Sequence, residues 1–312
     1  MADHPTLTLM IVHAHPDDEV IGSGGTLLRY ASEGVTTVLV TATGGEEGEI
    51  VDPAYNQIEA KPRLGEIRRV ELRAAAFVLK IGALELLGYR DSGMAGTPTN
   101  ENPDCLHQAD LLEATARLVH LIRRYRPEVL VSYNDYGTYG HPDHIKAYQI
   151  THEAFARAAD PTFAPEPGVD PWQPLKLYDQ AMTREVVQMW QQRTRVQREK
   201  QAANNAIAAN GADAISASAP TDVDGTSEAF FQTMLERSTP LADVTTRIDV
   251  RAYDDQKREA LRCHRTQIPA DSDFFRSALE IDPRLRNFEH LNRVRSLVEA
   301  PEREEDLFAG LR

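Results

Sequence analysis

Short apolar runs alternate with amphipathic segments along residues 6–182 of the chain. The runs predict strands, most clearly at Val35–Thr43, which is rich in β-branched residues, whereas apolar positions recur every three to four residues between the runs and predict helices. The predicted strands are 6–13, Val35–Thr43, Leu84–Leu87, Val129–Tyr133 and Leu175–Met182. The predicted helices are 24–33, Arg63–Ile81, 108–126 and about Pro142–Ala159. This alternation favours an α/β fold with a doubly wound, mostly parallel, Rossmann-like sheet.

The pattern is less regular after residue 183. The predicted elements there are a polar helix at 184–203, an irregular stretch at 203–226, an edge strand at Val244–Val250, a helix at Tyr253–Arg265, a loop at Asp271–Phe275 and a helix near 288–299. Because no repeat and no domain boundary stands out, we expect one domain over residues 1–312. Its α/β core is expected at 1–180, followed by a specificity segment and C-terminal helices at 181–312.

Composition and charge narrow the class of protein. The chain has 312 residues, and 34 Lys and Arg against 48 Asp and Glu give a net charge of −14. This acidity argues against nucleic acid or an anionic membrane as the main partner. The N-terminus has no signal-peptide pattern, and Cys105 and Cys263 form no CxxC motif. We therefore expect a cytoplasmic protein and leave open whether it forms a homo-oligomer.

Ionisable side chains crowd the end of the first predicted strand, in the stretch His13–Glu19. Two imidazoles and three carboxyl groups lie within these seven residues. Burying so many of them together without a cation would be costly. Ligands of an α/β sheet bind outside the carboxyl ends of its strands. The stretch therefore predicts a divalent metal held by His15 and Asp18, with Asp17 left for acid–base chemistry.

A second group of such residues, His141-Pro142-Asp143-His144, follows the strand Val129–Tyr133. His144 would complete a site of three ligands with His15 and Asp18. Imidazole and carboxylate suit zinc, and iron(II) is the alternative metal. A catalytic zinc keeps a position for water, for which the neighbouring Asp17 would be the general base. The alternative without a metal, in which His15 caps a helix or lies at the surface, is less favoured because two such motifs occur.

The remaining residues of this second region have two interpretations each. His141 either stabilises oxyanion charge or protonates the leaving amine. Asp143 either orients one of the imidazoles or is an ordinary carboxylate at a helix N-terminus. Tyr139 either directs its hydroxyl at the oxyanion or is an aromatic residue of the rim.

Two functions of other classes have to be weighed against an enzyme of this kind. A nucleotide-binding dehydrogenase would need a GxGxxG loop, whereas Gly22, Gly24 and Gly25 give only GxGG. A purely structural metal would leave the other ionisable residues of both motifs unexplained.

Glu19 is expected either to support the ligands or to cap the following helix. His264 is expected either to line the pocket or to pack a late helix.

Several motifs resemble the PIG-L/LmbE-type family of zinc-dependent N-acetylglucosaminide deacetylases. They are His15-Pro16-Asp17-Asp18-Glu19, Thr43-Gly44-Gly45-Glu46, Arg68-(x)2-Glu71 and His141-Pro142-Asp143-His144. Other stretches are similar to the mycothiol branch of that family, which contains a biosynthetic deacetylase and an S-conjugate amidase. They are Gly44–Glu49, Arg90–Gly96, Ala260–Gln267 and Asp306–Leu311. The resemblance covers about residues 8–160 and 255–312, and the weakly matched 160–250 are expected to line the substrate site.

The resemblance implies a role for each site residue. It implies three zinc ligands, namely His15, Asp18 and His144. It implies four groups that act on the acetamide, namely Asp17 as base, His141 as acid or oxyanion group, Asp143 orienting His141, and Tyr139 polarising the carbonyl. It implies three groups that hold sugar hydroxyls, namely Arg68, Glu47 and Asp91.

For Arg68 and Glu71 the alternative is an exposed pair on a helix, worth only a few tenths of a kcal/mol. The activity implied by the resemblance is removal of the acetyl group from a GlcNAc-inositol, giving acetate and a free amino sugar. The alternative activity is that of a mycothiol S-conjugate amidase, which cleaves a larger cysteinyl amide.

Overall fold

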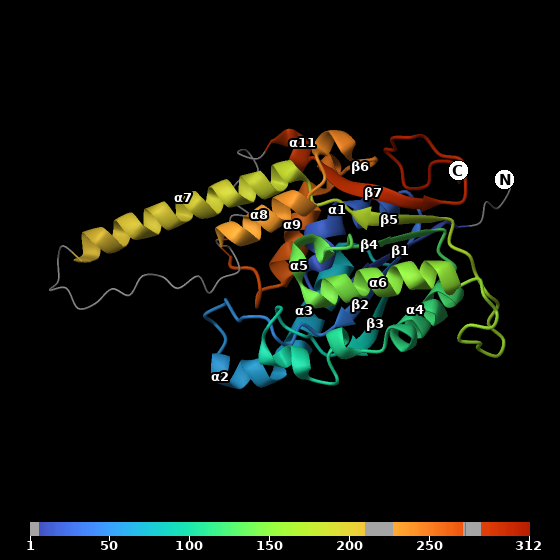
Figure 1. Cartoon of the computed structure of the whole chain (residues 1–312), viewed down its shortest axis with the longest axis horizontal. Helices are drawn as coiled ribbons and strands as arrows, with labels where there is room; N and C mark the ends of the chain where they lie inside the picture. The colour runs from blue at the N-terminus through green and yellow to red at the C-terminus, as the bar shows by residue number, and fades with distance from the viewer. Residues whose placement is uncertain (1–5, 210–226, 271, 273–281) are drawn as a thin grey trace. The chain divides into compact units, whose positions relative to one another are not determined.

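The computed structural model describes residues 6–209, 227–270, 272 and 282–312 (Figure 1). The chain divides into two compact units, Met1–Ala181 with Thr245–Arg312, and Met182–Val244. The first unit contains the whole described sheet, so residues beyond 245 complete a domain whose core was expected to end at 180. The expected grouping of 181–312 into one specificity segment stays a prediction.

The first unit is built on a seven-stranded sheet in the described part of the chain, with the order β3-β2-β1-β4-β5-β7-β6. Its strands are β1 (Thr8–His13), β2 (Thr36–Thr43), β3 (Ala83–Tyr89), β4 (Val129–Ser132), β5 (Lys176–Gln180), β6 (Thr246–Asp249) and β7 (Phe288–Ser296). The pairs from β3 to β5 are parallel, and β7 runs antiparallel to both β5 and β6. The predicted α/β class with a mostly parallel sheet is confirmed.

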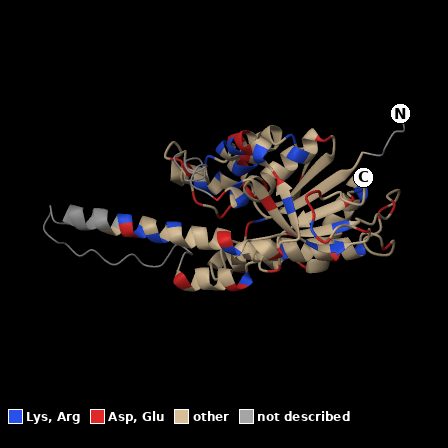
Figure 2. Ribbon diagram, turned by 90° about the horizontal axis from the view of Figure 1, so that it is seen from above, with Lys and Arg blue, Asp and Glu red and all other residues tan. Residues whose placement is uncertain are grey.

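Helices cover both faces of this sheet, so alternate residues of each central strand enter opposite cores. Leu9 and Ile11 of β1 belong to one core cluster, and Met10 and Val12 to the other. The first cluster includes residues of α1 (Asp18–Ser32), α3 (Leu64–Val78) and α9 (Asp254–Cys263). The second includes residues of α4 (Leu111–Tyr125) and α6 (Pro142–Arg157). Charged residues lie mostly on helices and loops in Figure 2, as burial of both sheet faces requires.

Shorter elements connect these layers. They are α2 (Gln57–Ala60), α5 (Gly137–Gly140), α11 (Pro283–Arg286) and 3₁₀ turns at Lys61–Arg63, Pro98–Glu101, Leu106–Gln108, Leu241–Asp243 and Arg251–Tyr253. Both cysteines are free thiols. Within the part of the chain that the structure describes, no helix is both long and apolar enough to cross a membrane.

The second unit contains α7 (Arg184–Ala209) and α8 (Glu228–Arg237). Trp190 of α7 meets Phe230 and Phe231 of α8 edge to face, at ring-centroid distances of 5.7 and 5.4 Å. The predicted polar helix is thus present and runs six residues beyond 203. Residues 210–226 of the predicted irregular stretch lie outside the described residues, as does all of the predicted loop Asp271–Phe275 except Ser272.

The first helix begins earlier than predicted, at Asp18 instead of residue 24. Its glycines lie inside the helix because other elements pack closely there. A Cβ atom added at Gly25 would lie 2.5 Å from Cβ of Val250. These glycines are therefore packing positions, which agrees with the rejection of a nucleotide loop.

The helix predicted near 288–299 is wrong, because Phe288–Ser296 is strand β7. Its inward positions are partly polar, which hides the two-residue period of a strand. Glu289 is buried there and accepts hydrogen bonds from the N–H groups of Gly25 and Thr26 at 2.9 and 2.8 Å. It also pairs with Lys257 at 2.5 Å. A carboxylate with so many partners can occupy a position that usually holds an apolar residue.

Candidate metal centre

The site lies where the winding of the sheet reverses. The chain runs from β1 outward to β2 and β3 on one side, and from β4 to β5 on the other. The carboxyl ends of β1 and β4 therefore form the switch point at which open α/β sheets bind ligands. The stretch that follows β1 carries His15 and Asp18, and the stretch that follows β4 leads to His144. Residues distant in sequence thus meet at one edge of the sheet.

Three of these side chains form a nearly equilateral triangle of potential ligand atoms. Nδ1 of His15 lies 3.2 Å from Nε2 of His144, and Oδ2 of Asp18 lies 3.4 Å from each of these nitrogens. Ligand atoms bound tetrahedrally at ~2.0–2.1 Å from zinc are ~3.3–3.4 Å apart. The triangle fits one such ion, and both imidazoles are buried. The described residues therefore contain a histidine and aspartate cluster able to hold a metal ion.

Wider groups of ligand atoms surround the same point. One consists of His15, His141 and His144, and the other of His15, Asp91, His141 and Asp143, with all ligand atoms of each group within 4.8 Å of one another. Burial lowers the pKa of His15, but the carboxylates, with Asp91 first, outweigh it and hold that pKa well above its usual value. The surrounding carboxylates therefore create a negative potential around this imidazole, and a metal cation that displaces the ring proton would be attracted by the same potential.

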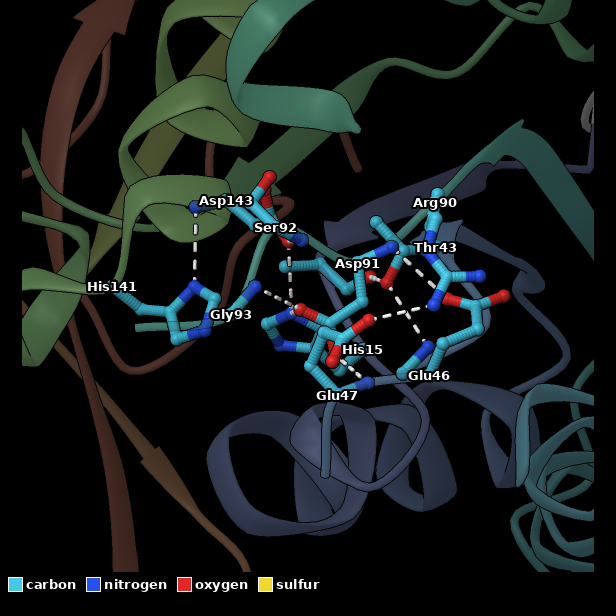
Figure 3. A network of polar contacts seen from close by, with 12 residues as sticks. His15, Thr43, Glu46, Glu47, Arg90, Asp91, Ser92, Gly93, His141 and Asp143 are labelled. Atoms are coloured by element: carbon cyan, nitrogen blue, oxygen red, sulfur yellow. Dashed lines mark hydrogen bonds and ion pairs between the residues drawn. The ribbon is translucent and has the colours of Figure 1, made fainter. Parts of the chain in front are cut away.

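The carboxylate of Asp143 supports His15 from behind (Figure 3). Its Oδ2 lies 3.2 Å from Nε2 of His15 and accepts the N–H of Ser92 at 2.9 Å. The hydroxyl of Ser92 donates to Oδ1 of the same carboxylate. A carboxylate on the outer nitrogen of a ligating histidine fixes the tautomer and the ring orientation. The expectation that this carboxylate orients His141 is corrected, since it contacts His15 instead.

His141 is held by the main chain of Asp143. Its Nδ1 accepts the Asp143 N–H at 3.1 Å, so the proton of the neutral ring lies on Nε2. Burial, together with His15 and His144, lowers the pKa of His141 to about 2. A neutral donor of this kind suits the oxyanion interpretation better than that of a charged acid.

Two tyrosines contact the ligand triangle, and the sequence predicted only one of them. The hydroxyl of Tyr139 lies 3.5 Å from Nε2 of His144, and burial raises its pKa, so the hydroxyl stays protonated. Tyr133 donates to Oδ2 of Asp18 at 2.7 Å and accepts the Ala14 N–H at 2.8 Å. Its ring stacks on His144 at 4.1 Å. Tyr133 closes an apolar strand pattern, so its place in the sequence does not indicate this contact.

Asp17 has a strained backbone and a shifted acidity. Its φ is 110°, a value that side chains other than glycine rarely adopt. Burial raises the pKa of Asp17 to about 6, although the Arg68 guanidinium acts in the opposite direction. Nη2 of Arg68 lies 3.3 Å from the Asp17 carboxylate. A base with a pKa of this size is ionised at neutral pH yet still accepts a proton readily.

The alternative of an exposed Arg68–Glu71 pair is wrong, because both residues are buried. Nη1 of Arg68 donates to the Gly45 carbonyl at 2.8 Å, while Glu71 accepts the N–H and hydroxyl of Thr266 at 2.8 and 2.6 Å. The two side chains therefore fix separate segments of the site instead of one another.

The other predicted hydroxyl-binding residues differ in access (Figure 3). Glu47 pairs with Arg90 at 2.7 Å, where its side chain is 18% and that of Arg90 45% exposed. Asp91 is buried, and its oxygens accept the N–H groups of Glu47 and Gly93 at 3.1 and 2.8 Å. Its Oδ1 also lies 3.5 Å from Nε2 of His15. Glu47 is thus placed to meet a ligand, whereas Asp91 lies behind His15.

Comparison with known sequences identifies relatives over most of the chain. The family model described as PIG-L, GlcNAc-PI de-N-acetylase, matches residues 10–155. A protein of Catenulispora acidiphila, named 1D-myo-inositol 2-acetamido-2-deoxy-alpha-D-glucopyranoside deacetylase 1, is 41% identical over 97% of this chain and 89% of its own. A protein of the same name, without the numeral, from Thermobifida fusca is 43% identical over 83% of both chains.

Solved structures agree on the fold. The N,N'-diacetylchitobiose deacetylase of Pyrococcus horikoshii matches with a TM-score of 0.60 at 18% identity, covering 93% of this chain and 85% of its own. The 4-carboxy-2-hydroxymuconate hydratase GalB of Pseudomonas putida matches with a TM-score of 0.58 at 20% identity, covering 95% and 99%. Since one is a deacetylase and the other a hydratase, this likeness establishes the fold and not the reaction. The chain belongs to the PIG-L family, because its sequence relatives match it over most of its length.

Proposed function

We propose that this protein is a zinc-dependent deacetylase of a GlcNAc-inositol, releasing acetate and the free amino sugar. The observation that carries the proposal is the triangle formed by His15, Asp18 and His144, with Asp17 next to one of its corners in the sequence. The names of relatives that are about 40% identical over most of the chain support the substrate.

His15, Asp18 and His144 would hold the ion. When bound, zinc supplies a Lewis acid and lowers the pKa of a water ligand to ~7. The residues of the chain supply the rest of the chemistry. Asp17, ionised at neutral pH, takes a proton from the attacking water and then holds it for the leaving amine.

Two donors face the developing oxyanion in this proposal. Burial lowers the pKa of His141, so its ring is neutral, and the ring proton lies on Nε2 because Nδ1 accepts the Asp143 N–H. Burial raises the pKa of Tyr139, so its hydroxyl stays protonated at neutral pH. Fixed donors in a buried site stabilise the tetrahedral intermediate more than the planar amide. Breakdown then gives acetate and the amine.

Substrate hydroxyls are proposed to meet Glu47 with Arg90 at the rim and Arg68 deeper in the site. Nε of Arg68 is buried without a hydrogen-bond partner among the described residues. Such a donor gains from a polar ligand group. Asp91 is proposed to act through His15, because its oxygens are already occupied.

The test combines metal content with product analysis on a panel of N-acetylglucosaminides. We expect equal amounts of acetate and free amine from GlcNAc-inositol, loss of activity with a chelator, and recovery with zinc. Parallel reloading with iron(II) under anaerobic conditions decides between the two metals. Release of a mercapturate from a mycothiol S-conjugate, in place of acetate, would instead favour the amidase. Active protein that is free of metal and insensitive to chelators would contradict the proposal.

A further inference from the structure

The conformation of Asp17 is imposed by its neighbours. Its φ of 110° is strained for a residue with a side chain and persists only where the surroundings determine it. The peptide group between Pro16 and Asp17 is held at both ends. Its carbonyl oxygen accepts Nη2 of Arg68 at 2.6 Å, and its N–H donates to Oε2 of Glu19 at 2.9 Å. Rotation of this peptide would relieve the strain and move the Asp17 carboxylate.

Glu19 is in turn held by a residue from the far end of the chain. Its Oε1 lies 2.6 Å from Nε2 of His264, which directly follows α9, and neither side chain has any exposed surface. The carboxylate raises the pKa of His264 in spite of burial, so the two groups form an ion pair. A buried carboxylate keeps its place only while such a partner is present.

The ligands have supports of their own. Oδ2 of Asp18 accepts the His15 N–H at 2.8 Å and the Tyr133 hydroxyl at 2.7 Å. His15 is backed by Asp143 at 3.2 Å. None of these contacts involves Glu19 or His264, so loss of the ion pair would leave the triangle in place.

We infer that His264 is a positioning residue for the hydrolysis, because its contact with Glu19 fixes the Pro16–Asp17 peptide and thereby directs the Asp17 carboxylate. The inference rests on the proposed function, in which Asp17 is the base. The contact joins the end of α9 to the start of α1, and it acts on turnover without acting on metal affinity.

The same C-terminal segment offers a matched control. Thr266 donates its N–H and hydroxyl to Glu71, and its carbonyl accepts the Val51 N–H at 2.9 Å. Replacing Thr266 by Val removes one of these side-chain contacts and leaves the pair of His264 and Glu19 unchanged. T266V therefore measures how much turnover is lost when the C-terminal segment is held less firmly while the contact between His264 and Glu19 stays in place.

The experiment compares H264L, H264Q and T266V in the zinc-loaded full chain. Displacement of a catalytic group by about 1 Å costs ~100-fold in rate, so H264L should lose ~100-fold in kcat. Its KM and its zinc affinity, measured by competition with a chelator, should stay within ~3-fold. H264Q keeps an N–H at the end of its side chain and should recover most of the kcat, while T266V should stay within ~3-fold of the wild type.

A second measurement does not depend on activity. Hydrogen exchange of the Asp17 amide should be slow in the wild type, H264Q and T266V, and fast in H264L, because its acceptor is then no longer fixed. A wild-type protein that releases no acetate overturns the proposed function, while the exchange rates still test the contact itself.

The inference is overturned if H264L keeps the wild-type kcat, if T266V loses as much, or if zinc affinity falls in step with kcat. Unchanged exchange of the Asp17 amide in H264L would overturn it as well. Should H264L fail to fold, the double variant E19Q/H264L removes the buried charge together with its partner. The same loss of kcat is expected there, and wild-type turnover in it would reject the role.

Discussion

Two buried clusters of charge in the first unit satisfy the same physical requirement in different ways. Near the C-terminus, Lys176 and Glu304 pair with no exposed side-chain surface. Arg293 and Tyr178 approach the same carboxylate at 2.9 and 2.8 Å. This cluster contains the cations that neutralise its carboxylate, and it joins β5 to the C-terminal segment.

At the candidate metal centre the carboxylates are contacted by groups of other kinds. Asp18 and Asp143 are approached by imidazole, hydroxyl and main-chain N–H groups. The nearby guanidinium of Arg68 is directed at Asp17 and at two main-chain carbonyls. A cluster of this composition is consistent with a metal site, in which a cation from solution would supply the missing positive charge. In the first cluster the cations that neutralise the buried carboxylate are side chains of the protein itself, and the cluster stabilises the fold. In the second cluster the cation is proposed to come from solution, and the cluster would serve the reaction.

The largest effects are expected from two substitutions that separate the ion from the base. His144→Ala removes one corner of the triangle, so zinc affinity and turnover should both be lost. Asp17→Ala leaves all three corners, so zinc should stay bound while kcat falls by ~10²–10⁴-fold. Metal analysis and acetate release on both purified variants check this. Equal zinc content with equal activity in the two variants would refute the assigned roles.

A smaller effect, on stability alone, is expected at the other cluster. Lys176→Met leaves the Glu304 carboxylate buried without its nearest cation and should lower the free energy of unfolding by ~3–5 kcal/mol. Adding Glu304→Leu removes the uncompensated charge and should restore part of the loss. Denaturant unfolding measures both variants, with zinc affinity as the control. A loss of zinc affinity in Lys176→Met would show that the two clusters are not independent.

The smallest effect concerns pH. The Arg68 guanidinium lowers the pKa of Asp17, against the burial that raises it to about 6. Activity requires ionised Asp17, so it should rise with pH through this pKa. Arg68→Met removes the opposing positive charge and should shift the acidic limb of the kcat profile to higher pH; this shift is read from the shape of the profile, separately from the loss of kcat expected when Arg68 no longer holds the Pro16 carbonyl. A shift to lower pH would exclude Asp17 as the group that titrates. The control is Arg63→Met, because Arg63 is exposed and directly precedes α3, the helix that carries Arg68.

The fold was predictable where the hydrophobic pattern of the sequence matches the burial of the residues in the structure. Strands β1, β2 and β4 consist mostly of apolar and β-branched residues, and β3 and β5 are partly apolar, so the existence of these five strands could be read from the sequence to within a few residues at each end. Strand β7 could not, because the partners of Glu289 come from a helix more than 260 residues away in the chain. The ligand triangle was predictable because its motifs stand at strand ends, where topology brings them together.

The supports of the site were predictable only in part. The sequence indicated that Asp143 orients an imidazole, but which one depends on ring directions that no spacing encodes. Tyr133 and His264 were hidden because the first ends an apolar run and the second meets Glu19 across the fold. The substrate role of Asp91 could not be judged without its main-chain donors.

The antiparallel insertion of β7 between β5 and β6 has a consequence for biosynthesis. All three expected ligands have been synthesised once residue 144 is made, whereas β7, Glu304 and the partner of Glu19 are made later. A nascent chain therefore carries metal-binding side chains well before it can bury Lys176 or fix the turn at Asp17. The side chains proposed to hold the ion are consequently made well before those that complete the catalytic geometry.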